Sequence, residues 1–176
     1  MAGTGKADRT QSFPSRLGRT VDSISQFANR RGIYFGRRST RAHVALYRRT
    51  GGRLGGHLPG RPNARILLLD HVGARSGIHR TSPVIYCESG DVIAVIASKA
   101  GQPAHPAWFH NLVANPETTI QLGAEIRHVR ARVATADERA ALWPICAETY
   151  PGYDFFQRLA HPRVIPIVLL EPSPKT

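Results

Sequence analysis

The sequence lacks the features that define several large protein classes. No run of apolar residues reaches the roughly 18 that a membrane-spanning helix needs. Only two cysteines are present, Cys87 and Cys146, which excludes a disulfide-rich scaffold and a four-cysteine zinc site. We therefore expect both cysteines as reduced thiols in a cytosolic protein. Hydrophobic residues make up 41% of the 176 residues, so the chain can form a packed core and is not disordered throughout.

Acidic residues are scarce in the first third of the chain. Residues 1–65 contain 14 Lys and Arg but only two acidic residues, whereas residues 66–176 contain ten of each. The net charge of +12 therefore belongs to the N-terminal part. We expect residues 1–40 to form a basic, partly disordered or amphipathic arm, and residues 41–176 to form the folded domain. Such an arm suits an anionic partner, either nucleic acid or a membrane surface, and its composition is also typical of a mitochondrial transit peptide.

Short strands dominate the rest of the chain. Val129, Ala131 and Val133 alternate with polar residues, as in a sheet with one face in water. Thr135 and Glu138 have the spacing of a helix capping box. The pattern predicts strands at 64–72, 81–87, 91–98, 118–122, 125–134 and 164–170, and helices at 20–35, 39–50, 106–114, 135–149 and, in part, 150–159. Six strands without a βαβ rhythm predict a mainly β fold, an antiparallel barrel with α additions, rather than a Rossmann domain.

Two basic segments have the composition of an anion site. Residues 73–77 begin and end with glycine and contain Arg75 and Ser76, and Arg80 follows three residues later. Tight backbone and guanidinium donors are what phosphate or carboxylate recognition needs, and each charge-assisted hydrogen bond there would contribute roughly 1.5–3 kcal/mol. Lys99 follows a predicted strand and can reach an anionic ligand from its end. The alternative for both segments is a turn with solvated charges.

Aromatic residues gather in two places. Trp108 and Asn111 share one face of a predicted helix, so that one can stack on a ligand while the other forms a hydrogen bond. Tyr150, Tyr153 and Phe156 recur every three residues and would line a hydrophobic pocket with two hydroxyls, although a core stripe is the alternative. A phenol can donate a proton to a reduced product. The spacing of residues indicates neither a Ser-His-Asp arrangement nor a metal site.

These segments together resemble the deazaflavin (coenzyme F420)-dependent nitroreductase and quinone reductase family of actinobacteria. The resemblance covers about residues 42–172 and rests on motifs in a fixed order: Gly73-x-Arg75-Ser76-Gly77-x-x-Arg80, Ala97-Ser98-Lys99-x-Gly101, Pro106-x-Trp108-x-x-Asn111-Leu112-x-x-Asn115-Pro116, Trp143-Pro144 with Tyr150-Pro151-x-Tyr153, and Ile165-Pro166-Ile167-Val168-Leu169. It implies a split antiparallel β-barrel of the FMN-binding type. It also implies an enzyme that transfers hydride from reduced coenzyme F420 to a quinone, a nitroaromatic or another electrophilic acceptor.

The resemblance implies roles for individual residues. The basic side chains and Ser76 would hold the anionic phosphate and glutamate tail of the cofactor, while Pro83 and the backbone of residues 96–98 would flank the deazaflavin ring. The full cofactor-binding set comprises Gly73, Arg75, Ser76, Gly77, Arg80, Pro83, Ile96, Ala97, Ser98, Lys99, Trp108 and Asn111. Tyr150, Tyr153 and Phe156 would form the acceptor side as the catalytic residues. Ala74 and Phe156 depart from the family pattern, which commonly has a basic residue and a Tyr there, so tail affinity and the reduction of nitroimidazoles are open.

Other functions stay open beside this one. A protein with the same barrel could bind FMN or haem without deazaflavin chemistry. The basic arm could bind nucleic acid, but the aromatic residues are not interleaved with the basic run, so we expect no nucleic-acid partner. For a cytoplasmic reductase, we expect the arm to hold the protein on the inner face of the cell membrane, near a menaquinone-like acceptor. An open barrel edge would allow a homodimer.

Overall fold

The computed structural model describes residues 37–173. Its helices are α2 (Arg37–Thr50), α3 (Ala107–Ala114), α4 (Ala136–Thr149) and α5 (Gly152–Ala160), and a short 3-10 turn, η1, spans Lys99–Gly101. Its strands are β1 (His57–Leu58), β2 (Arg61–Val72), β3 (His79–Ser89), β4 (Val92–Ile96), β5 (Glu117–Leu122), β6 (Glu125–Val133) and β7 (Ile167–Pro172). The predicted helix at 20–35 and most of the basic arm lie outside the described residues.

Six of the strands close into an antiparallel barrel. The strand order is β1-β2-β3-β4-β7-β6-β5, and an additional pairing of β2 with β5 joins the two ends of the sheet. This closing pair aligns Leu68 with Gln121 and Leu69 with Ile120. The predicted antiparallel barrel with α additions is therefore confirmed. The expectation of an open barrel edge is wrong, because β5 supplies the partner of β2 on that side.

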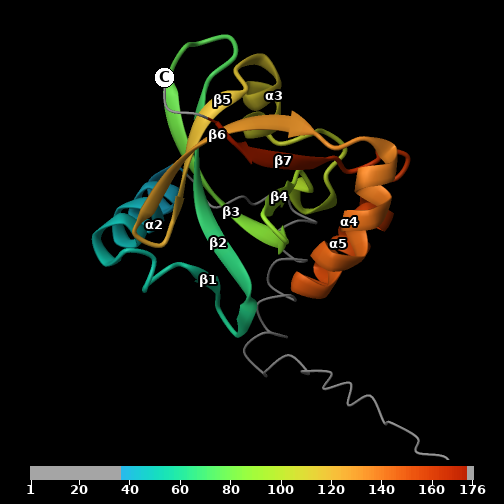
Figure 1. Cartoon of the computed structure of the whole chain (residues 1–176), viewed down its shortest axis with the longest axis horizontal. Helices are drawn as coiled ribbons and strands as arrows, with labels where there is room; N and C mark the ends of the chain where they lie inside the picture. Colours follow the sequence, from blue (N-terminus) through green and yellow to red (C-terminus); the bar gives the residue numbers. More distant parts are fainter. Residues whose placement is uncertain (1–36, 174–176) are drawn as a thin grey trace, which may run out of the picture.

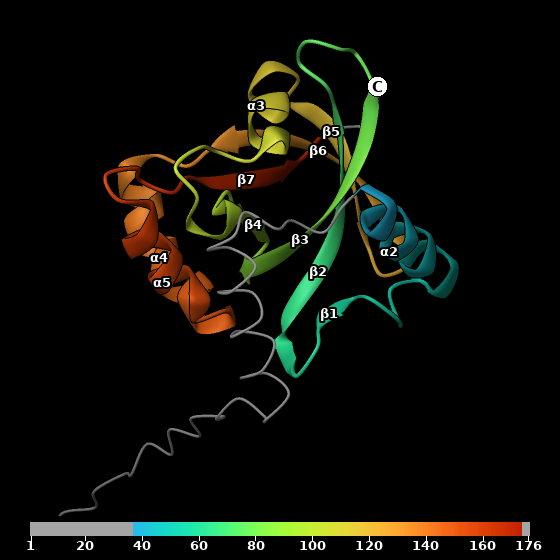
Figure 2. The same ribbon diagram turned by 180° about the vertical axis from the view of Figure 1, so that it is seen from behind.

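The helices cover different sides of the barrel. Figure 1 shows α4 and α5 on one flank, α3 near one end of the barrel and α2 on the opposite flank, and Figure 2 gives the same arrangement from behind. The predicted capping box is present at the start of α4, where the Thr135 side chain accepts from the backbone N–H of Glu138. No helix within residues 37–173 combines the length and the apolar content needed to cross a membrane.

Alternation along the strands divides the apolar side chains between two cores. One core fills the barrel and includes Leu67, Leu69, Val95, Ile120, Val129 and Leu170. The other lies between the outer face of the sheet and the helices α4 and α5, and includes Ile96, Ile167, Leu169, Cys146 and the three predicted catalytic aromatics. Burial of one such aliphatic side chain contributes about 1.5–3 kcal/mol. Neighbouring residues of one strand point into different cores. The pairing register of a strand therefore decides which of its side chains are buried in a core and which can contact a ligand.

Helix α2 is anchored to the barrel by one buried phenol. Tyr47 is 1% exposed, and its hydroxyl donates to the carbonyl of Ile66 at 3.0 Å and accepts from the N–H of Gly123 at 2.9 Å. Gly52 has a φ of +76°, and an added Cβ would lie 2.9 Å from the Cα of Gly123. The turn after α2 therefore needs glycine in order to approach the β5–β6 turn.

The prediction of two free thiols is wrong for this structure. Cys87 on β3 and Cys146 on α4 form a disulfide, with their Cα atoms 5.4 Å apart. Both residues belong to the core between the sheet and α4. The two cysteines are 59 residues apart in the sequence, and only the packing of α4 on β3 brings them together. Among residues 37–173 no other cysteine exists.

Candidate functional site

A cleft of about 2220 Å³ extends between α2 and the barrel and reaches the end of the barrel near α3. We call it the α2 cleft. Among the predicted cofactor residues, Arg80, Pro83, Lys99 and Trp108 line it. These four residues come from β3, η1 and α3, which are separate in the sequence. The fold therefore brings two cations, a proline and a tryptophan to one cavity.

The glycine turn between β2 and β3 is ordered by its own backbone. Gly73 donates to the carbonyl of Ile78 at 2.9 Å, and Gly77 donates to the carbonyl of Gly73 at 2.8 Å. Gly77 has a φ of +63°, which favours glycine. Arg75 and Ser76 are exposed on this turn and do not line the α2 cleft. The turn presents a guanidinium and a hydroxyl to solvent beside the cleft, an arrangement that suits an anion.

The loop that carries Lys99 has an unusual backbone. Lys99 and Ala100 have φ values of +47° and +51°, a region that costs about 1–2 kcal/mol for a residue with a Cβ. Arg163 donates to the carbonyl of Ser98 at 2.8 Å, to that of Ala97 at 3.3 Å and to that of Gln102 at 2.7 Å. One planar guanidinium thus fixes carbonyls on both sides of the strained residues. Strain of this kind is typical of functional sites.

A buried polar network connects the glycine turn with the α2 cleft. Asn111 on α3 is 8% exposed, and its Oδ1 accepts from the backbone N–H of Ala74 at 3.0 Å. Its Nδ2 lies 2.8 Å from Nδ1 of His71 on β2, and Nε2 of His71 lies 3.0 Å from Oγ of Ser82 on β3. Burial, reinforced by the positive charge of Arg80, lowers the pKa of His71 from 6.5 to about 4. The imidazole is therefore neutral at physiological pH.

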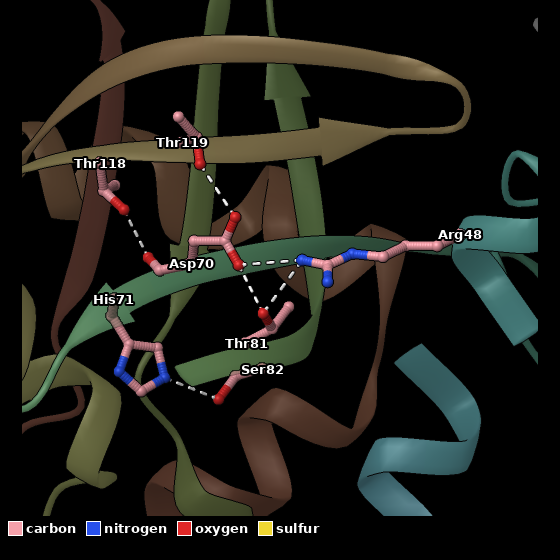
Figure 3. A network of polar contacts seen from close by, with 7 residues as sticks. All are labelled: Arg48, Asp70, His71, Thr81, Ser82, Thr118 and Thr119. Atoms are coloured by element: carbon pink, nitrogen blue, oxygen red, sulfur yellow. Dashed lines mark hydrogen bonds and ion pairs between the residues drawn. The ribbon is translucent and has the colours of Figure 1, made fainter. Parts of the chain in front are cut away.

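A second network lies on the outer wall of the same strand. Asp70 accepts from the Thr81 hydroxyl, from the Thr119 hydroxyl at 2.9 Å and from Arg48 of α2 at 3.3 Å. Figure 3 shows Asp70 and its neighbour His71 on opposite sides of β2, so the strand separates the two networks. The Arg48–Asp70 ion pair joins α2 to the barrel wall; its side chains are 50% and 39% exposed, so its contribution to stability is small.

The predicted catalytic aromatics occupy a different place. Tyr150, Tyr153 and Phe156 are 5%, 5% and 7% exposed and pack on each other in the core beneath α4 and α5. The rings of Tyr150 and Tyr153 meet edge to face, with centroids 5.2 Å apart. Burial raises the pKa of the Tyr153 phenol. None of the three lines the α2 cleft, so the structure does not join them to Arg80, Lys99 and Trp108 in one cavity.

Three further predicted cofactor residues, Ile96, Ala97 and Ser98, precede Lys99 in the chain and do not line the α2 cleft. Ile96 and Ala97 are buried at the end of β4, and Ser98 is half-buried at the start of the Lys99 loop.

The sequence did not single out His71, Ser82 or Arg163, because a lone histidine, serine or arginine in a strand or loop has no distinguishing pattern. Within residues 37–173 there is no group of three His, Cys, Asp or Glu residues that could hold a metal ion.

Comparison with known proteins gives a consistent result. Residues 39–172 match a family model described as F420H(2)-dependent quinone reductase. The chain is 38% identical over 136 residues to an F420H(2)-dependent quinone reductase of Mycobacterium tuberculosis, covering 74% of this chain and 87% of that protein. A solved F420-H2-dependent reductase is similar at a TM-score of 0.56 and 36% identity, over 60% of this chain and 93% of that one. A structure described as a domain-swapped dimer is similar at a TM-score of 0.59 and 29% identity, over 86% of this chain and 99% of that one.

Proposed function

The chain belongs to the F420H(2)-dependent quinone reductase family, and from this premise we propose which of its residues hold the cofactor and where the acceptor is reduced. As a member of the family it is an oxidoreductase that uses reduced coenzyme F420 and transfers hydride to a quinone. The proposal assigns the cofactor to the α2 cleft. The observation that carries it is the convergence of Arg80, Pro83, Lys99 and Trp108 on that cleft.

The electrostatics of the cleft fit an anionic cofactor tail. Burial lowers the pKa of His71, which lines the cleft, and of His105, which lies outside its lining. In each case a nearby cation acts in the same direction: Arg80 beside His71, where Asp70 opposes it more weakly, and Arg163 and Lys99 beside His105. Protonation is disfavoured at both sites partly because positive charge is already concentrated there. The same positive field attracts phosphate and carboxylate groups. We assign the tail to Arg80 and Lys99, with Arg75 and Ser76 of the exposed turn at its outer end.

The work of this chain is to position the reactants and to control their electrostatics. The deazaflavin ring supplies the hydride when the cofactor is bound. Holding donor and acceptor in reactive geometry provides much of the rate enhancement in such reactions. Pro83 and Trp108 are apolar groups in the cleft and would keep water from one side of the ring. Asn111 is held in place by Ala74 and His71 and would keep Trp108, on the same helix, in position.

For the acceptor we propose a menaquinone-like quinone, and nitroaromatic compounds as further acceptors. Tyr150, Tyr153 and Phe156 would form the acceptor side, as the family resemblance implies. Their support in the structure is the contact of α5 with the Lys99 loop: a Cβ added to Gly101 would lie 2.9 Å from both the Phe156 carbonyl and Cβ of Leu159. The aromatic cluster therefore lies directly behind a loop that we assign to the cofactor.

Tyr153 gives the test of this acceptor assignment. Tyr153→Phe keeps the ring and its packing and removes only the hydroxyl. We expect turnover of menadione to fall several-fold with little change in F420 affinity, because the phenol can donate a proton to the reduced product. Leu142→Ala, in the same apolar core, serves as a packing control. Equal turnover of Tyr153→Phe and wild type would show that Tyr153 only packs.

A membrane-surface location would bring the site to a lipid-soluble quinone. We propose that the basic arm, residues 1–40, binds the anionic inner face of the cell membrane from the cytoplasm. Support comes from the charge of the arm and from α2, whose arginines Arg38, Arg41, Arg48 and Arg49 are exposed.

We also propose that the protein forms a homodimer, since one similar structure is a domain-swapped dimer. The mass of the protein by light scattering tests this assembly.

The first experiment is a titration with F420, followed by mixing with reduced F420 and menadione. Return of the visible absorbance of oxidised F420 reports turnover. Binding with turnover supports both cofactor site and acceptor class. Binding without turnover would refute the quinone assignment and retain the cofactor site. If F420 does not bind, the cleft assignment is wrong, and FMN and haem are then the ligands to titrate.

A further inference from the structure

The hydrogen positions in the network from Ala74 to Ser82 can be deduced atom by atom. A backbone N–H can only donate, so the Asn111 atom facing Ala74 must be the carbonyl oxygen Oδ1. The other amide atom, Nδ2, can also only donate, so Nδ1 of His71 must accept and carry no proton. The proton of the neutral imidazole is therefore on Nε2.

This tautomer fixes the role of Ser82. Nε2–H of His71 donates to Oγ of Ser82 at 3.0 Å, so that contact uses a lone pair of the hydroxyl and not its proton. No acceptor for the Ser82 hydroxyl is found among residues 37–173. Ser82 is half-buried and lines the α2 cleft next to Pro83. Figure 3 shows Ser82 facing His71, whereas its neighbour Thr81 faces Asp70. Adjacent residues of a strand point to opposite faces of the sheet, so the Asp70 carboxylate does not compete for the Ser82 proton.

We propose that Ser82 donates a hydrogen bond to a ring-conjugated carbonyl oxygen of the ligand in the α2 cleft, and that His71 and Asn111 are positioning residues that fix its direction. The inference rests on the proposed function for the identity of that ligand. Two molecules offer the required chemistry: the deazaflavin ring of the cofactor and the quinone acceptor both carry carbonyl oxygens conjugated to a ring. In either case the donor would be prearranged, because the residues behind it are buried and hydrogen-bonded.

Ser82→Ala removes the donor and leaves the residues behind it in place. Ser89→Ala makes the same change on the same strand, outside the α2 cleft, and is the matched control. Loss of one hydrogen bond to a neutral group corresponds to about a three- to tenfold change in an equilibrium or rate constant. The dissociation constant of oxidised F420 and kcat/KM for menadione at saturating reduced F420 are measured for each variant, with near-UV circular dichroism as the check on folding.

The two measurements separate the two sources of the carbonyl. A three- to tenfold weaker F420 affinity with unchanged kcat/KM assigns the carbonyl to the cofactor. An unchanged F420 affinity with a three- to tenfold lower kcat/KM assigns it to the quinone. If Ser82→Ala matches Ser89→Ala in both quantities, the proposal is overturned. If wild-type protein does not bind F420, the proposed function fails and the identity of the ligand fails with it.

The positioning role is tested by His71 itself. His71→Gln keeps an N–H donor near the position of Nε2, whereas His71→Leu does not, so Gln should preserve more of the affected constant. Equal losses in the two variants would overturn the positioning role. A readout independent of the ligand is the ¹⁵N spectrum of the His71 ring, assigned by its loss in His71→Gln. We expect protonated Nε2 and unprotonated Nδ1 near neutral pH, and the opposite tautomer would refute the deduced network.

Discussion

Arg80 and Lys99 are the two cations that line the α2 cleft among the predicted cofactor residues. We expect Arg80→Ala and Lys99→Ala each to weaken F420 binding by about ten- to a hundredfold, since a hydrogen bond to a charged group contributes roughly 1.5–3 kcal/mol. Fluorescence titration of the cofactor measures the effect. Arg158→Ala removes an exposed cation of α5 outside the cleft and should bind F420 as wild type does. An equal loss in Arg158→Ala would mean that net charge, not these two residues, attracts the cofactor.

His71 should make folding stability dependent on pH. Its pKa is lowered from 6.5 to about 4 in the folded protein, first by burial and then by Arg80. Between these values the unfolded chain binds a proton that the folded chain does not, so the free energy of unfolding falls as pH decreases through this window and levels off below it. Over the whole window the contribution amounts to about 3 kcal/mol.

Urea unfolding of wild type and His71→Gln at about pH 7 and about pH 4.5 measures this effect. Other groups also titrate over that window, so the relevant quantity is the difference between the two proteins. The stability of wild type should decrease more on acidification than that of the variant. Parallel decreases would contradict the lowered pKa of His71.

Site residues with a local sequence signature could be predicted. Site residues whose role comes only from contacts with distant parts of the chain could not. The glycines around Arg75, and Lys99 at a strand end, are visible in the sequence because turns and charged strand ends have local signatures. His71 and Arg163 acquire their roles from atoms that lie 40 to 66 residues away in the sequence and that no spacing rule connects. These atoms are Asn111 Nδ2 for the histidine and the Ala97 and Ser98 carbonyl oxygens for the arginine. Periodicity alone also could not decide whether Tyr150, Tyr153 and Phe156 are buried in the core or line a pocket, because both arrangements have the same spacing.

The conformation of the Lys99 loop depends on contacts with Arg163, a residue far from the loop in the sequence. Arg163 lies in the connection between α5 and β7 and bonds the loop at Ala97, Ser98 and Gln102. We expect Arg163→Lys to release the loop, since an ammonium cannot reproduce a planar fork of donors. F420 affinity should fall several-fold, and the backbone amides of Gly101 and Gln102, which bond within the loop, should exchange hydrogen faster.

Two further variants separate loop geometry from overall stability. Arg139→Lys alters another half-buried arginine, which bonds the Ile165 carbonyl and Gln157, and does not touch the loop. It should change stability without changing F420 affinity. If Arg163→Lys weakens F420 binding no more than Arg139→Lys does, Arg163 has no special role in the site.

Strands and helices were predicted well where the local pattern is strong. The capping box at Thr135 and the alternation around Val129 gave α4 and β6 nearly to the residue. The final strand starts at Ile167, three residues later than predicted, and Val164 is 61% exposed. Closure of the barrel by β2 and β5 and the Cys87–Cys146 bond could not be predicted. Both depend on segments about 50 to 60 residues apart, whose pairing is decided by three-dimensional packing.

Charge is divided unevenly over the protein, and this asymmetry predicts membrane binding. Residues 1–36 contain six Lys and Arg and two acidic residues, and α2 adds five arginines and no acid. Each basic residue near an anionic leaflet contributes about 1 kcal/mol, and salt weakens the attraction. We expect the full chain to sediment with vesicles that contain phosphatidylglycerol at low salt and to remain in solution with neutral phosphatidylcholine vesicles.

Deletion of residues 1–36 tests which part carries this binding. The deletion removes a net charge of +4 and keeps α2, so we expect at least a tenfold loss of vesicle affinity with F420 affinity unchanged. Arg38→Glu with Arg41→Glu, two exposed arginines of α2, tests the helix separately. Unchanged vesicle binding after the deletion, together with a loss in the α2 variant, would move the membrane contact to α2, at the rim of the cleft. The quinone would then enter next to the proposed cofactor site, because α2 itself forms one wall of that cleft.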